Sequence, residues 1–200
     1  MFEEFLVEFE LTGNLEENIK NFFGKEFESV AKHSCEVAAC AKILAERFNQ
    51  EPKAAEYGGL LHDISAVIPN NQRIAVAEAW GIPIIEAERK LPMIVHQKLS
   101  RHIANEIFKV NDESILSAIE CHTTLKSKPT KMDQIVFIAD KIKWDQKGEP
   151  PYLEELLSAL DNSLEEASLV YLNYLLNSHP QVIHPWALEA QTELSKRISL

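Results

Sequence analysis

Apolar residues recur at helical spacing along most of the chain. Leu15, Ile19, Phe22 and Phe23 have the i, i+4, i+7, i+8 spacing of one helix face, and Asn14 is suited to cap that helix. Similar patterns predict further helices around residues 33–48, 52–61, 72–80, 84–90, 96–108, 112–122, 132–142, 152–160, 163–177 and 185–198. No segment alternates convincingly as a strand does. The sequence therefore predicts an all-α class with about eight to ten helices of ordinary length.

Proline and glycine divide this helical pattern. The run 148–151, Gly-Glu-Pro-Pro, is the best linker in the chain, and Lys128-Pro129-Thr130 is a shorter break. We expect one domain over residues 1–200, with a core at about 28–146. The helices of about 151–200 are expected to pack on that core as a C-terminal extension.

Six polar side chains are predicted to point inward from apolar helix faces: His33, His62, Asp63, His96, His122 and Asp140. Taken singly, an inward histidine is more often a hydrogen-bonded core residue, and Asp140 can pair with a nearby lysine such as Lys141 or Lys143. Taken together, each group buried without a partner would cost about 1–3 kcal/mol. A metal satisfies all of them at once. Imidazole and carboxylate suit Fe, Mn, Zn or Mg, and the lack of a cysteine ligand pattern disfavours a structural zinc site.

The ordered series H…HD…H…H…D on helices resembles the HD-domain metal-dependent phosphohydrolase superfamily. Within it the chain is most similar to the YqeK-like branch, symmetrical dinucleoside polyphosphate hydrolases. The matching segments are HSCEVAACAKILAERF, AAEYGGLLHDIS, MIVHQKLSRHIA, ILSAIECHTTLKSKPTKMDQIVFIADKI and VIHPWALEAQ. They span about residues 30–190, so the resemblance implies an HD-domain helical bundle for most of the chain.

The resemblance implies two divalent ions, with iron the first expectation and Mn, Mg or Zn as alternatives. One ion would be held by His33, His62, Asp63 and Asp140, and the second by His96 and His122, with Asp63 bridging the two. A metal-bridging hydroxide would attack phosphorus, since two cations clamp the attacking and departing oxygens of an in-line displacement. His62 and Asp63 would be the catalytic residues, and Asp63 would orient the nucleophile.

The chain departs from the family pattern where cations are usual. Val30 stands where the family commonly has arginine, Ala66 where it usually has lysine, and the arginine expected after ADKI is missing from KWDQKGEPPY. Gln97 and Leu125 replace family glycines. The remaining candidates for substrate binding are Lys98, Arg101, Thr123 and Lys141. For the basic residues plain surface charge is an equal alternative, and Thr123 can instead cap its helix.

Three functions remain open on these residues. The first is a metal-dependent phosphohydrolase for a nucleotide or dinucleoside polyphosphate. The second is an HD-fold nucleotide sensor that keeps the metal with weakened catalysis. The third, a structural helical protein, is disfavoured because all six ligands are present. Outside this set, Trp144 is expected to pack in the core rather than stack on a base, and His102 to lie off the His96 face, where it can line a pocket.

The net charge limits the kinds of molecule that the protein is expected to bind. Twenty Lys and Arg against 31 Asp and Glu give a formal net charge of -11, which argues against nucleic-acid polymers and anionic membranes. Small phosphorylated nucleotides remain expected partners, because bound cations supply local positive charge. No run of 18 apolar residues exists, the N-terminal MFEEFLVEFEL is unlike a signal peptide, and the three cysteines include no CxxC. These features predict a cytoplasmic protein. Its acidic C-terminal helices either form a homodimer or are solvated.

Overall fold

The computed structural model describes residues 11–144 and 146–198. These residues form α-helices and short 3-10 helices, without a strand in the described part, so the all-α prediction is confirmed. The N-terminal segment judged unlike a signal peptide lies almost wholly outside the described residues. In chain order the elements are α1 (Leu15–Phe23), α2 (Glu28–Arg47), α3 (Pro52–Leu61), η2 (Ile64–Val67), α4 (Arg73–Ala79), α5 (Glu86–Lys90), η3 (Pro92–Val95), α6 (His96–Glu106), α7 (Glu113–Cys121), α8 (Lys131–Ile142), α9 (Leu153–Leu160), α10 (Leu164–Asn177) and α11 (Pro185–Ile198).

The described residues contain eleven α-helices, one more than the upper end of the predicted eight to ten; the shortest are α4 and α5, with seven and five residues. The predicted cap at Asn14 is confirmed: its side chain accepts a hydrogen bond from the Glu17 backbone N–H, which satisfies one donor that the first turn leaves free. The Thr130 hydroxyl likewise accepts from the Asp133 N–H and begins α8 directly after the predicted break.

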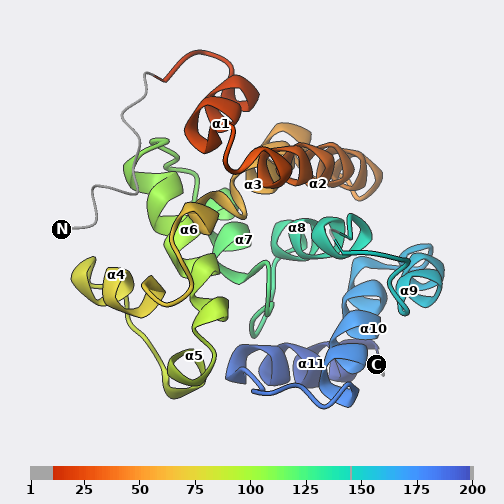
Figure 1. Cartoon of the computed structure of the whole chain (residues 1–200). Coiled ribbons are helices and arrows are strands. Elements are labelled where there is room, and N and C mark those ends of the chain that lie inside the picture. The colour runs from red at the N-terminus through yellow and green to blue at the C-terminus, as the bar shows by residue number, and fades with distance from the viewer. Residues whose placement is uncertain (1–10, 145, 199–200) are drawn as a thin grey trace.

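Helix α8 forms the centre of the core. Ile135, Val136, Phe137 and Ile138 are fully enclosed, so this helix buries successive residues rather than a single stripe. It packs against α2, α3, α7 and α10, and Figure 1 shows it in the middle of the molecule between α2 and α10. A helix enclosed in this way has a fixed position, and so does the carboxylate of Asp140 near its end.

Helices α2 and α3 pack most closely at a glycine. A Cβ atom on Gly59 would lie 2.6 Å from Ala38 Cα, well inside van der Waals contact, so only glycine allows this approach. Because α2 carries His33 and α3 leads directly into His62 and Asp63, the close packing sets the distance between these side chains.

The C-terminal helices contact the rest of the fold at several points, among them the Arg47 guanidinium of α2, which donates to the Leu160 carbonyl oxygen at 2.9 Å. Helix α10 packs on α8 and α9, and α11 packs on α10. At the other end of α11, buried His184 lies 3.5 Å from a carboxylate oxygen of Glu88 on α5, so α11 lies along the lower edge of the molecule between α5 and α10 (Figure 1). The single domain over residues 1–200 stays a prediction. No described helix has both the length and the apolar character needed to cross a membrane.

Candidate metal centre

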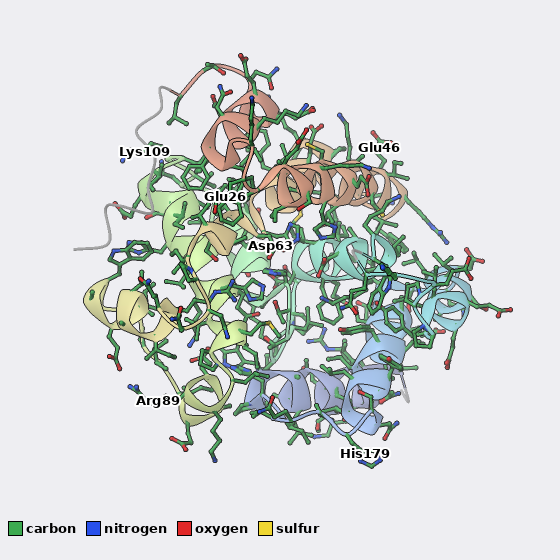
Figure 2. All side chains as sticks on the ribbon, viewed as in Figure 1. Glu26, Glu46, Asp63, Arg89, Lys109 and His179 are labelled. Carbon is green, nitrogen blue, oxygen red and sulfur yellow. The ribbon has the colours of Figure 1, made fainter. Side chains whose placement is uncertain are left out.

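The structure brings all six inward-facing residues into one cluster, from five separate parts of the fold. His33 comes from α2, His62 and Asp63 follow α3, His96 begins α6, His122 follows α7, and Asp140 lies on α8. Figure 2 shows Asp63 near the centre of the molecule, whereas Glu46, Arg89, Lys109 and His179 lie at its edges. Three overlapping groups of ligand atoms within 4.8 Å of one another make up the cluster: His33, His62 and Asp63; His62, His122 and Asp140; and Asp63, His96 and His122.

Three of the histidines are oriented by the same local contact. Nδ1 of His62 lies 2.7 Å from the Gly59 carbonyl oxygen, and His96 Nδ1 lies 2.6 Å from the Met93 carbonyl. His122 Nδ1 is 2.8 Å from the carbonyl of the residue three positions earlier, in the same way. A carbonyl oxygen only accepts, so each Nδ1 carries the proton and donates it. Each Nε2 then presents a lone pair to the interior, which is the form of imidazole that binds metals.

The lone pairs converge on the two aspartates. His96 Nε2 and His122 Nε2 are 2.9 Å apart, and they lie 3.3 and 3.4 Å from Asp63 Oδ1. His62 Nε2 lies 3.5 Å from Asp63 Oδ2 and 3.6 Å from Asp140 Oδ1, is fully enclosed, and has no hydrogen-bond partner among the described residues. Such an enclosed, unpartnered acceptor would be costly. A cation between these atoms satisfies it and removes the repulsion between facing lone pairs, so the donor set fits divalent metal.

The protonation states of the cluster residues also fit the binding of a divalent metal. Burial lowers the pKa of His122 to about 4, so its ring is neutral near pH 7. Burial alone would raise the pKa of the Asp140 carboxyl, but the Lys141 ammonium and His33 beside it hold that pKa well below its usual range. Neutral imidazole and ionised carboxylate are the ligand forms that a hard or borderline divalent cation requires.

Two of the four predicted substrate-binding residues lie at this cluster. Thr123 Oγ1 is 3.1 Å from both His96 Nε2 and His122 Nε2. Lys141 Nζ pairs with Asp140 and lies 5.1 Å from the centre of the Tyr171 ring. A lysine pair was the alternative to metal binding that the sequence left for Asp140, and Lys141 is that lysine.

The other two predicted substrate-binding residues, Lys98 and Arg101, form ion pairs with glutamates outside the cluster. This corrects the expectation that their charges are available beside the ligands. Lys98 is buried, with Nζ 2.8 Å from Glu88 Oε1 and 2.8 Å from the Pro83 carbonyl oxygen. Arg101 pairs with Glu113 at 2.9 Å. Helical spacing places both on α6 near His96, but the partners that neutralise them come from other segments.

A cavity of about 180 Å³ opens on the cluster, and part of its wall comes from residues that the sequence did not single out. Tyr152 and Tyr171 line it together with Lys141, Trp144 and Gln146. Both tyrosines belong to the C-terminal helices, more than ten residues along the chain from the nearest ligand, so no sequence spacing links them to the site. They are placed there because α10 packs on α8.

Gln97 and Leu125 stand where the family commonly has glycine. Gln97 is accommodated by hydrogen bonds, whereas Leu125 has a strained backbone. Buried Gln97 hydrogen-bonds Thr124 Oγ1 at 3.2 Å and accepts from the Thr123 backbone N–H at 3.3 Å, so it braces the loop beside the cluster. Leu125 adopts φ of 56°, the left-handed conformation that favours glycine. Of the remaining histidines, His102 stacks on Trp80 at 4.6 Å, and His179 is exposed.

Comparison with known proteins identifies the family of this chain. The model of the HD domain matches residues 30–145, more than half of the chain. The chain belongs to the HD domain family. The matched HD region contains all six residues of the histidine and aspartate cluster, so the resemblance noted from the ordered histidines and aspartates is confirmed.

Relatives extend the match beyond this region. A Lactococcus lactis subsp. cremoris protein, described as an uncharacterized protein in the pepC 5′ region, is 51% identical over 141 residues, covering 70% of this chain and 72% of that protein. The symmetrical bis(5′-nucleosyl)-tetraphosphatase of Bacillus subtilis (strain 168) is 25% identical over 135 residues, 68% of this chain and 71% of that enzyme. The crystal structure described as a predicted HD superfamily hydrolase involved in NAD metabolism, from Clostridium acetobutylicum, is 26% identical with a TM-score of 0.79, covering 92% of this chain and 96% of that one.

Proposed function

We propose that this HD-family protein is a metal-dependent phosphohydrolase that acts on a nucleotide or a dinucleoside polyphosphate. The observation that carries the proposal is the convergence of four histidines and two aspartates with their metal-binding atoms turned toward one another. The similarity to a symmetrical bis(5′-nucleosyl)-tetraphosphatase supports the substrate class.

Six residues would hold two divalent ions, with iron proposed first and Mn, Mg or Zn as alternatives. His33, His62, Asp63 and Asp140 form one proposed set, while His96, His122 and Asp63 form the other. The two oxygens of Asp63 support its shared role, because Oδ2 lies beside His62 and Oδ1 beside His96 and His122. When bound, such cations neutralise phosphate oxygens and lower the pKa of water toward neutrality.

The protein's own groups then position the substrate. Lys141 holds its charge firmly, because the adjacent Asp140 carboxylate keeps the lysine pKa above its usual range in spite of burial. Its ammonium lines the cavity and would meet a phosphate oxygen, and the Thr123 hydroxyl would donate to another. Asp63 would orient the attacking water through a carboxylate oxygen. Tyr152 and Tyr171 would form part of the cavity wall beside Lys141.

A nucleotide sensor is the second candidate. It is favoured by the shortage of free cations, since Val30 and Ala66 are apolar and the charges of Lys98 and Arg101 are paired with Glu88 and Glu113. A polyphosphate would then meet few protein cations besides Lys141 at the cluster, which weakens binding of the charged transition state.

Elemental analysis and turnover separate these functions. Purified protein should contain about two divalent ions per chain and release nucleotide from a dinucleoside tetraphosphate, and His62→Ala/Asp63→Ala should lose both properties. The matched control is Arg47→Ala/Asp161→Ala, which removes an exposed ion pair that does not line the cavity at the cluster. Metal without turnover on a nucleotide panel would favour the sensor. Protein without metal would refute both functions, and turnover that survives the His62/Asp63 substitution would identify a contaminant.

A further inference from the structure

A second cavity adjoins the metal cluster on the α2 side. It has a volume of about 230 Å³ and is lined by Ser29, Val30, Lys32, His33, Glu36, Asp63 and Trp144. His33, Asp63 and Trp144 also line the cavity that opens on the cluster. The two spaces therefore meet at the ligands, with the indole of Trp144 as a wall common to both.

The two cavities differ in the chemistry of their walls. The cluster cavity has the carboxylates, imidazoles and Lys141, which suit metal and phosphate. In the α2 cavity, Val30 and Trp144 supply apolar surface, while Lys32 and Glu36 form a pair of opposite charges 3.8 Å apart. That pair is nearly neutral, and the Asp63 carboxylate on the same wall would repel a phosphate. A flat, neutral, aromatic group suits this space better.

Size leads to the same conclusion. Pockets that enclose a whole small ligand measure about 300–1,000 Å³, and the α2 cavity and the cluster cavity reach this range only together. A ligand that fills both would place its phosphates at the cluster and a neighbouring group of limited size in the α2 cavity. In a nucleotide that neighbouring group is the nucleoside.

Trp144 is placed to receive such a group. The ring follows α8 directly, is partly exposed, and is braced on one side by Tyr152, whose ring lies 6.0 Å away edge to face. Tyr152 is itself buried, and its hydroxyl donates to the Lys141 carbonyl oxygen at 3.2 Å. The indole N–H is enclosed without a hydrogen-bond partner among the described residues, so phenylalanine would fill the place without this cost. The ring is thus supported from behind and is not explained by packing alone.

We propose that Trp144 is a specificity-determining residue whose indole stacks on the nucleobase of the substrate in the α2 cavity. This inference rests on the proposed function for its substrate class. The neutral base contributes dispersion and stacking energy against the ring, and it needs none of the cations that the chain lacks. The sequence favoured core packing over stacking for Trp144. The ring does pack partly against the core, and its position between two cavities is what favours stacking by its remaining surface.

The test compares ligands that share a diphosphate and differ by the nucleoside. ADP and pyrophosphate are titrated into wild-type protein and into Trp144→Ala and Trp144→Phe, with binding followed by calorimetry and tryptophan fluorescence. Trp144→Ala should weaken ADP binding by about 5- to 150-fold, equivalent to about 1–3 kcal/mol, and leave pyrophosphate binding unchanged. Trp144→Phe should keep most of the ADP affinity. ADP should quench wild-type fluorescence, and this quenching should be absent in both variants.

Trp80→Phe is the matched control, because its ring stacks on His102 away from the cluster, so it should retain the quenching by ADP. Equal weakening of ADP and pyrophosphate, unchanged ADP affinity in Trp144→Ala, or no ADP binding by the wild type would each overturn the stacking role. Thermal unfolding of each variant verifies folding, and Trp144→Phe serves if Trp144→Ala is unfolded. A wild-type protein that binds ADP through Trp144 but hydrolyses no dinucleoside tetraphosphate would support stacking and refute the proposed hydrolysis.

Discussion

Replacing Gly59 by alanine should weaken both the fold and the metal centre. The added Cβ would lie 2.6 Å from Ala38 Cα and 2.7 Å from Ala38 N, both backbone atoms of α2 that cannot rotate away. Contact between carbon atoms is favourable at about 3.5–4.0 Å, so α2 and α3 must separate by about 1 Å locally. Overpacking of this kind costs up to about 3 kcal/mol.

The helix itself offsets part of this loss, since alanine is favoured over glycine in a helix interior by about 1 kcal/mol. The net destabilisation is about 2 kcal/mol, which lowers the melting temperature by about 4–8 °C for a chain of this length. The Gly59 carbonyl also accepts the Nδ1 proton of His62 at 2.7 Å. Displacing it should lower metal affinity about tenfold, as loss of an orienting contact does.

Gly58→Ala is the matched control. Its Cβ would meet the Val136 side chain, with Cγ2 at 2.8 Å, and no backbone atom of α2. Because Val136 is fully enclosed, we expect this variant also to lose up to about 3 kcal/mol of stability to overpacking, but to keep its metal affinity, since α2 and α3 need not separate. Urea denaturation and metal titration by calorimetry measure both quantities. If Gly59→Ala matches Gly58→Ala in metal affinity, the close approach of α2 and α3 does not control the centre.

Three further outcomes are expected. Asp63→Asn should lose most bound metal in elemental analysis after dialysis, because it removes the charge that both proposed ions share; retention of two ions would contradict the bridging role. Lys98→Met should cost about 3–5 kcal/mol in urea denaturation, since it leaves fully enclosed Glu88 without its lysine, whereas Lys90→Met, at an exposed pair, should cost less than about 1 kcal/mol. In metal-stripped protein, burial lowers the pKa of His122 to about 4 in the folded state. Below pH about 6.5 its imidazole is therefore protonated in the unfolded chain but stays neutral in the folded protein. Stability should therefore fall between about pH 6.5 and 4, by up to about 3 kcal/mol, and His122→Asn should flatten that fall; an equal slope in both proteins would contradict the assignment.

The metal cluster shows what could be predicted from the sequence and why. His33, His96, His122 and Asp140 stood out because each interrupts an apolar helix face, and the periodicity of that face reports which side chains are buried. The predicted helix cap at Asn14 is equally local, because its hydrogen bond joins residues three positions apart. Even the orienting contacts of the histidines span only three residues.

Contacts between distant segments could not be predicted in this way. Lys98 and Arg101 have the spacing of residues near His96, yet Glu88 and Glu113 neutralise them, and no periodicity identifies those partners. The places of Tyr152 and Tyr171, and the position of Trp144 between two cavities, depend on how α10 packs on α8 and α9. The sequence alone determined the all-α class, the buried faces and the ligand types. The tertiary structure decided which faces meet, because side-chain packing between helices, not periodicity within one helix, sets which charges are neutralised and where a cavity remains.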